Sequence, residues 1–168
     1  MTPTLYWIDG PWVGRLAISA RPRGGDWLED EVKGWKSAGV NVVASLLEPE
    51  EVEALDLNEE EKLSSTNGIA FLSFPIPDRK VPGSYTDALN FLRELEKELV
   101  TGKNVAVHCR QGLGRSAIIA ASLLELAGLD TETAIDRVSV ARGYTVPETV
   151  EQAGWVARFT QESAQIRS

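Results

Sequence analysis

The feature that most constrains this chain is a short segment around its only cysteine and its only histidine. His108 and Cys109 stand side by side, after the β-branched run Val105–Val107. Two glycines follow them, and a long apolar helical pattern begins at Arg115. A strand, a glycine-bearing loop and a helix start can turn successive backbone N–H groups toward one point, where the first helical turn adds partial positive charge. The segment therefore predicts an anion-binding loop that begins with a thiol and ends with a guanidinium.

Composition limits the partners of such a loop. The chain has 168 residues and a formal net charge of −8, which disfavours general binding to nucleic acid or to an anionic membrane. We expect residues 1–168 to form one domain, most simply a monomer. One cysteine cannot form an internal disulfide, and neither a signal peptide nor an apolar run of about 18 residues is evident. A cytoplasmic protein is the resulting expectation.

Strands and helices are predicted to alternate along the chain. β-branched and apolar runs predict strands over Leu5–Ile8, Val13–Ser19, Val40–Leu47, Ile69–Phe74 and Val105–Val107. Helical spacing and capping residues predict helices after Asp26, Ser84, Asp130 and Thr145, over Arg115–Ala127, and as one or two short pieces between residues 48 and 67. The expected fold class is α/β, with a central, mostly parallel sheet of about five strands and helices on both faces.

Two further local patterns give specific expectations. Thr145 and Glu148 have the spacing of a capping box, with Pro147 in the first turn, and predict the start of the last helix there. The acidic run from Glu48 to Glu61 is expected to form a solvated face.

The central loop has the residues that displacement at a phosphate ester requires. Cys109 attacks only as a thiolate, and inward N–H groups with a nearby guanidinium favour that anion. Arg115, six residues later, can fold back and offer its planar fork to two phosphoryl oxygens. The hydroxyl of Ser116 can donate to the thiolate when it is expelled, and His108 is expected to hold the loop from behind. A buried structural thiol beside a core histidine is the alternative, which the surrounding residues argue against.

The remaining loop positions are expected to bind or border the substrate. Gly112 and Gly114 permit the positive φ angles and close backbone approach that a phosphate cradle requires. Arg110, Gln111 and Leu113 are predicted to line the rim of the pocket, where Arg110 offers an additional positive charge.

The pattern His-Cys-x-x-Gly-x-x-Arg-Ser resembles the signature of the protein-tyrosine phosphatase superfamily. The segment Gly-Leu-Gly-Arg-Ser looks like the dual-specificity branch of this superfamily. Within that branch, the stretches Ala134-Ile-Asp136 and Ala141-Arg-Gly143 are similar to those of kinase-associated phosphatases. A weaker resemblance extends from about Leu16 to Phe159. It implies that Cys109 forms a phosphocysteine, that Arg115 binds phosphate and that Ser116 assists thiolate departure. It implies no metal or organic cofactor.

A leaving phenoxide or alkoxide needs an acid, and Asp78 is the candidate. It follows a predicted strand in the proline-stiffened sequence Phe-Pro-Ile-Pro-Asp, 31 residues before Cys109. In α/β sheets, loops at the carboxyl ends of strands gather around the site. The family places its acid in a loop about 30 residues before the cysteine, which supports Asp78 over the alternative of a solvated turn residue.

The expected activity is hydrolysis of phosphomonoesters: phosphotyrosine, and also phosphoserine or phosphothreonine, on proteins. A phosphatase of inositol phosphates or another small phosphorylated metabolite, and a phosphoprotein-binding module, are the alternatives. A sulfurtransferase or an arsenate reductase would also use an anion-cradled cysteine but would not require Asp78. Glu148-Thr149 with Gln152 is similar to a water-positioning Gln-Thr pair and second Gln of longer tyrosine phosphatases, but the first glutamine is absent here. Glu148 is equally consistent with a helix cap.

Overall fold

The computed structural model describes residues 3–167 and contains one mixed five-stranded sheet. The strands are β1 (Leu5–Ile8), β2 (Leu16–Ser19), β3 (Val42–Ser45), β4 (Ala70–Ser73) and β5 (Val105–His108). They lie in the order β1-β2-β5-β3-β4, and only the β1–β2 pair is antiparallel. The prediction of a mostly parallel sheet of about five strands is therefore confirmed.

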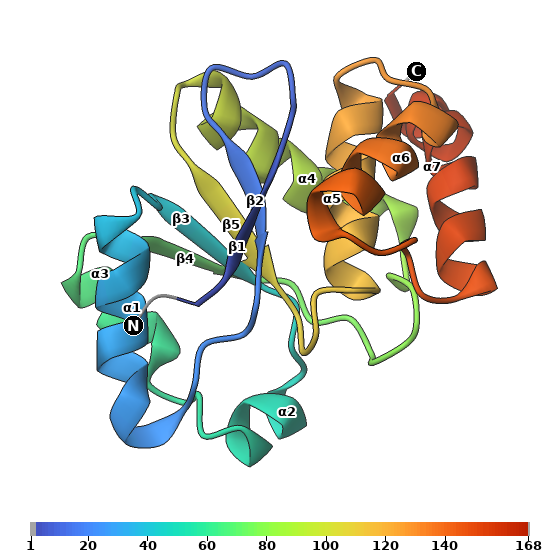
Figure 1. Cartoon of the computed structure of the whole chain (residues 1–168). Helices are drawn as coiled ribbons and strands as arrows, with labels where there is room; N and C mark the ends of the chain where they lie inside the picture. Colours follow the sequence, from blue (N-terminus) through green and yellow to red (C-terminus); the bar gives the residue numbers. More distant parts are fainter. Residues whose placement is uncertain (1–2, 168) are drawn as a thin grey trace.

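Helices cover both faces of this sheet (Figure 1). A 3-10 turn (Gly25–Trp27) leads into α1 (Leu28–Ser37), which lies with α2 (Pro49–Ala54) and α3 (Glu60–Thr66) on one side. The other side carries α4 (Tyr85–Val100), α5 (Arg115–Leu126), α6 (Thr131–Arg142) and α7 (Val150–Arg167). None of these helices of the described region is long and apolar enough to span a bilayer.

The central strand shows why the sheet needs two covered faces. All four residues of β5 are buried, as expected for an internal parallel strand. Val105 and Val107 belong to the core beneath α4 to α7, whereas Ala106 belongs to the smaller core beneath α1. This period-2 alternation gives each face its own apolar layer.

The start of the last helix differs from the prediction. Helix α7 begins at Val150, so the capping box at Thr145 and Glu148 was wrong. Thr149 and Gln152 form the reciprocal pair instead: the Thr149 Oγ1 accepts from the Gln152 N–H at 3.1 Å, and the Gln152 Oε1 accepts from the Thr149 N–H at 3.2 Å. The cap therefore lies later in the chain, and Glu148 is free to serve another contact.

The topology places the cysteine segment at the centre of the molecule. Strand β5 lies between β2 and β3, and all three run parallel, so their carboxyl ends meet at one edge of the sheet. The loop from Cys109 to Gly114 leaves β5 at this edge and enters α5. Sites of α/β proteins form at such an edge, where neighbouring connections leave on opposite faces.

Candidate active site

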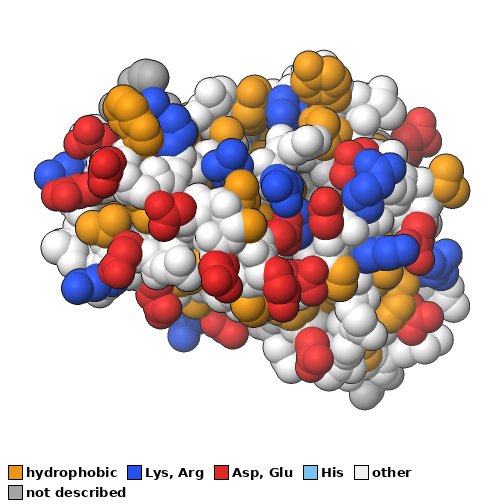
Figure 2. Space-filling view, turned by 90° about the horizontal axis from the view of Figure 1, so that it is seen from below, with side chains coloured by type: hydrophobic (Ala, Val, Ile, Leu, Met, Phe, Trp, Pro, Cys, Tyr) orange, Lys and Arg blue, Asp and Glu red, His pale blue; other side chains and the backbone are white. Residues whose placement is uncertain are grey.

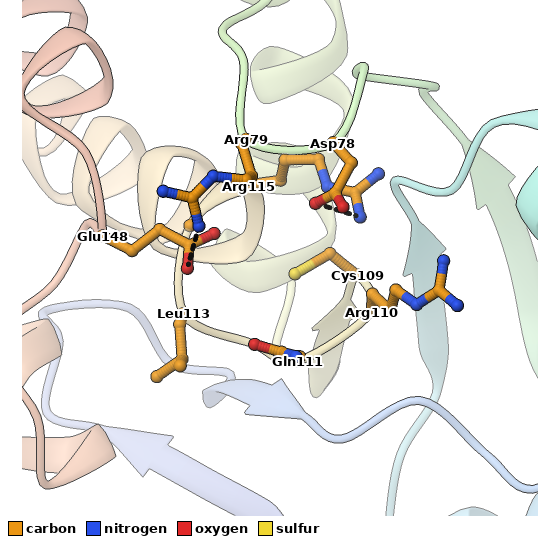
Figure 3. A pocket seen from close by; sticks show the side chains of 9 residues that line it. Asp78, Arg79, Cys109, Arg110, Gln111, Leu113, Arg115 and Glu148 are labelled. Atoms are coloured by element: carbon orange, nitrogen blue, oxygen red, sulfur yellow. Dashed lines mark hydrogen bonds and ion pairs between the residues drawn. The ribbon is translucent and has the colours of Figure 1, made fainter.

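A pocket of about 170 Å³ opens over the loop that follows β5. Its lining combines that loop with two distant segments: Asp78, Arg79, Cys109, Arg110, Gln111, Leu113, Gly114, Arg115 and Glu148. The Cys109 thiol lies within it, beneath Asp78 and the Arg115 guanidinium (Figure 3). Cys109 is only 3% exposed, so a reacting group must enter the pocket to meet its sulfur.

The backbone of the loop turns toward the sulfur. The Gly112 N–H donates to the Cys109 Sγ at 3.2 Å. Gly112 has a φ of 74°, in the left-handed region, and a Cβ there would lie 3.1 Å from Ile18 Cγ2. At Gly114, a Cβ would lie 2.8 Å from side-chain atoms of both Glu148 and Gln152. Gly112 is therefore required for its dihedral angle. Gly114 has a φ of −116°, so the expected positive φ there was wrong, and the atoms that a Cβ would meet are the ends of flexible side chains.

Arg115 is 2% exposed and is held by acceptors on two segments, helix α2 and the loop after β4. Its Nη1 donates to the Glu51 Oε1 at 2.6 Å and to the Ile76 carbonyl at 2.9 Å. Its Nη2 donates to the Glu51 Oε2 at 2.9 Å and to the Asp78 Oδ1 at 3.2 Å. These bonds use the four N–H groups of the two terminal nitrogens and leave Nε–H as the fifth donor.

Charge pairing is strong around this guanidinium. Burial lowers the pKa of Arg115, but the hydrogen bonds to Glu51 and the charges of Cys109, Glu51 and Asp78 raise it above its ordinary value. Burial raises the pKa of Glu51, yet the bonds from Arg115 and from the Glu48 backbone outweigh it and leave the pKa below 4.5. Both groups are therefore ionised near neutral pH, and Glu51 fixes the orientation of the fork.

The acidic run from Glu48 to Glu61 was wrongly predicted to be a solvated face throughout. Glu51 is 9% exposed and Glu60 only 2%, and each contacts the central segment. Glu51 and Glu60 lie 64 and 48 positions away from their partners in the sequence, so no local sequence pattern predicts these contacts. The available signal is Pro49, which begins a helix a few residues after the end of β3 and so places Glu51 near that edge of the sheet.

His108 lies beneath the loop and is fully buried. Its Nδ1 is 3.3 Å from the Cys109 carbonyl oxygen, and its Nε2 is 2.7 Å from the Glu60 Oε2. The ring also stacks on Trp35, with centroids 5.9 Å apart. A carbonyl oxygen can only accept, so the Nδ1 side of the ring donates to the backbone of Cys109, and the Nε2 side meets the buried Glu60 carboxyl group. The imidazole thus contacts the backbone of the cysteine on the side away from the pocket.

Asp78 reaches the pocket from the loop after β4, and its side chain is 52% exposed. Three bonds hold that loop over the site. Arg115 bonds both Asp78 and the Ile76 carbonyl, and the Gln152 Nε2 donates to the Lys80 carbonyl at 3.0 Å. Arg79, which has a φ of 63°, pairs with Glu148 at 3.4 Å. Gln152 and Glu148 therefore hold the loop of Asp78 to the start of α7.

Arg142 supports the outer side of the central loop. In a cradle whose N–H groups point inward, the carbonyl groups point outward and need donors. The Arg142 Nε donates to the Gly112 carbonyl at 3.1 Å, and its Nη2 donates to the Gln111 carbonyl at 3.0 Å. Its guanidinium also lies 4.1 Å from the ring centre of Tyr6 and 5.3 Å from that of Tyr144. This residue was not predicted as part of the site.

The other predicted residues take distinct places. Ser116 is fully buried, and its Oγ has no hydrogen-bond partner among the described residues. The Arg110 side chain extends away from the thiol and comes within 3.8 Å of Glu51 (Figure 3). Gln111 and Leu113 border the pocket. Within residues 3–167, no group of three or more His, Cys, Asp and Glu side chains is arranged to hold a metal ion.

A thiol, a guanidinium and a carboxyl group thus lie around one pocket. Residues 19–128 match the model of the polymorphic toxin system DSP-PTPase phosphatases. The chain belongs to this family. The match begins at the end of β2 and ends after α5, so it includes the loop of Asp78 and the central loop.

Curated relatives of this DSP-PTPase domain are partial matches. The cyclin-dependent kinase inhibitor 3 of Sus scrofa is 31% identical over 99 residues, which are 58% of this chain and 46% of that protein. The putative tyrosine phosphatase 197R of Invertebrate iridescent virus 6 is 25% identical over 159 residues, or 90% of this chain and 54% of the viral protein. The chain spans about half the length of the curated relatives it matches.

Solved structures agree over nearly the whole domain. Tk-PTP in its active form is 29% identical, with a TM-score of 0.79, and the match covers 95% of this chain and 97% of that one. Kinase associated phosphatase, with serine in place of its catalytic-site cysteine, has a TM-score of 0.88 at 21% identity over 98% and 97% of the two chains. At 21% identity, the similarity to kinase associated phosphatase shows a shared fold. The resemblance to dual-specificity phosphatases stated from the loop pattern is confirmed.

Proposed function

We propose that this chain hydrolyses phosphomonoesters through a phosphocysteine intermediate and that its substrates are phosphorylated proteins. The observation that carries the proposal is the convergence of the Cys109 thiol, the Arg115 fork and the Asp78 carboxyl on one pocket. Family membership supports it. Phosphotyrosine is the preferred residue, with phosphoserine and phosphothreonine as further substrates.

The first step is in-line attack of the Cys109 thiolate on phosphorus. The sulfur–phosphorus bond forms while the bond from phosphorus to the ester oxygen breaks, and the electron pair leaves with that oxygen. Asp78, in its acid form, gives this oxygen a proton. The loop N–H groups and Arg115 bind the other phosphoryl oxygens. Arg115 can offer its Nε–H and, once Asp78 turns to the leaving group, the Nη2–H that now bonds Asp78.

The second step returns the enzyme to its starting state. Water attacks phosphorus, the Asp78 carboxylate accepts its proton, and the sulfur–phosphorus bond breaks to release inorganic phosphate and the thiolate. The buried Ser116 hydroxyl, which has no partner among the described residues, can donate to the departing sulfur. His108 and Glu60 hold the carbonyl of Cys109 from behind and take no proton in this scheme.

A substrate panel with one variant tests the reaction. Purified protein and Cys109→Ser are assayed on p-nitrophenyl phosphate, phosphopeptides, inositol phosphates and nucleotides, and acid-quenched samples are examined for phosphate bound to Cys109. Turnover that is lost in Cys109→Ser, together with a trapped phosphocysteine, is expected. Turnover that persists in the variant would refute the mechanism. A preference for inositol phosphates or nucleotides would refute the protein-substrate assignment alone.

A further inference from the structure

The cations of the pocket are paired with carboxylates. Three arginines line the pocket. Arg115 is bound by Glu51 and Asp78, Arg79 pairs with Glu148 at 3.4 Å, and Arg110 approaches Glu51 at 3.8 Å. Figure 2, which views the edge of the sheet where the pocket opens, shows basic and acidic side chains standing next to one another rather than in separate patches.

Such pairing leaves one place for an anion. The loop N–H groups and the Arg115 fork can receive the phosphoryl group that is transferred. A second negative group beside it would meet an Arg79 already neutralised by Glu148, and it would also approach the Glu148 carboxylate itself. The net charge of −8 adds a repulsive background.

Glu148 is the residue that sets the local charge next to the phosphate site, at the wall of the pocket. Its side chain is 25% exposed, against 64% for Arg79, so the carboxylate is the more sheltered member of the pair. It packs on the central loop, where a Cβ on Gly114 would lie 2.8 Å from its Oε1. It also lines the pocket together with Cys109. The pair itself is exposed to solvent, so the Glu148 charge acts on groups that come within about a Debye length of it, as a group bound beside the phosphate would.

From this arrangement we infer that Glu148 is a specificity-determining residue. It restricts the enzyme to phosphomonoesters that carry no second anionic group next to the phosphate. The preferred substrates are therefore phosphorylated residues with neutral or basic neighbours, and multiply phosphorylated molecules and phosphopeptides with acidic flanks are disfavoured. The inference rests on the proposed phosphatase activity.

The test compares two phosphotyrosine peptides that differ only in the flanking residues, glutamine in one and glutamate in the other, with p-nitrophenyl phosphate as a third substrate. For the wild-type protein, kcat/KM should be about tenfold higher on the glutamine peptide. In Glu148→Gln, the ratio should fall to within about threefold, because the carboxylate is removed and Arg79 is released. The matched control is Glu151→Gln, an exposed glutamate in the first turn of α7 that does not line the pocket, which should keep the wild-type ratio.

The outcomes separate this inference from the proposed function. Equal kcat/KM on the two peptides with wild-type protein, or an unchanged ratio in Glu148→Gln, would overturn the inference. An equal fall on all three substrates would do the same, because it would make Glu148 a support of the loop of Asp78 and not a selector. If p-nitrophenyl phosphate shows no turnover that depends on Cys109, the proposed function itself fails.

Discussion

The two sides of the central loop differ in the partners of their hydrogen-bonding groups. On the pocket side, the Gly112 N–H donates to the Cys109 sulfur, and Asp78 contacts the Arg115 guanidinium from a half-exposed position. On the outer side, loop carbonyls accept from Arg142 and His108, and those donors are fixed by aromatic rings and by the buried Glu60. On the pocket side, the bonds of Arg115 leave its Nε–H over and Asp78 is half exposed, whereas on the outer side the donors of Arg142 and His108 bond the loop carbonyls. We therefore expect the residues on the pocket side to take part in the reaction and those on the outer side to keep the loop rigid.

The largest effect is expected at Arg115, on the pocket side. Arg115→Lys keeps the charge but loses the planar fork, so it cannot bind two phosphoryl oxygens and Glu51 together. We expect kcat/KM on p-nitrophenyl phosphate to fall by about 10³-fold. Steady-state kinetics with Cys109→Ser as the blank measures this loss. Turnover within about threefold of wild type would show that the planar fork is not needed to bind the phosphate.

Asp78 should show the next largest effect, and its size should depend on the leaving group. Asp78→Ala removes the acid, so kcat on phenyl phosphate should fall by about 10²-fold or more, while substrate still binds. On p-nitrophenyl phosphate, whose leaving group is far less basic, the loss should be smaller. The exposed Asp87→Asn serves as a control. Equal losses on the two esters would remove Asp78 from the role of acid.

A smaller effect is expected on the outer side. Arg142→Met keeps much of the apolar length against Tyr6 but removes both donors to the loop carbonyls. Unpaired carbonyls loosen the cradle, so kcat should fall by about tenfold. Arg137→Met is the matched control, since Arg137 lies on the same helix and donates to the Asp9 carbonyl, away from the loop. Equal activity in the two variants would mean that the cradle keeps its shape without Arg142.

The same comparison explains what the sequence could and could not predict. The five strands, the helix caps at Ser84 and Asp130 and the loop residues follow from local patterns, which act over a few positions. Glu51, Glu60 and Arg142 belong to the site only through partners 64, 48 and about 30 positions away. A glutamate in an acidic helix has the same local pattern whether it faces water or a buried arginine. The residues that support the loop can therefore be found only in the structure, whereas the loop residues that we propose to react could be proposed from the sequence.

The smallest effect on turnover should come from Glu125, at the end of α5 far from Arg115. It is 6% exposed, its Oε2 accepts from Thr131 and Thr160, and its Oε1 has no partner among the described residues. Burial raises its pKa from 4.5 to about 7, although both threonine bonds act to lower it. Between these two values the folded state binds the proton more tightly than the unfolded state does. Stability from this group is therefore fully present below about pH 4.5 and is lost as the pH rises through about 7.

Glu125→Gln should remove this dependence of the unfolding free energy on pH. Urea unfolding at pH 5 and pH 8 should show that the wild type loses about 2 kcal/mol more than the variant between the two conditions. The turnover of the two proteins at pH 7 should agree within about twofold, because Glu125 touches neither side of the loop. Parallel stability changes in wild type and variant would show that Glu125 is ionised in the folded protein at both pH values. A large loss of turnover would show instead that the far end of α5 influences the position of Arg115, and that the separation between reactive and supporting residues extends beyond the loop.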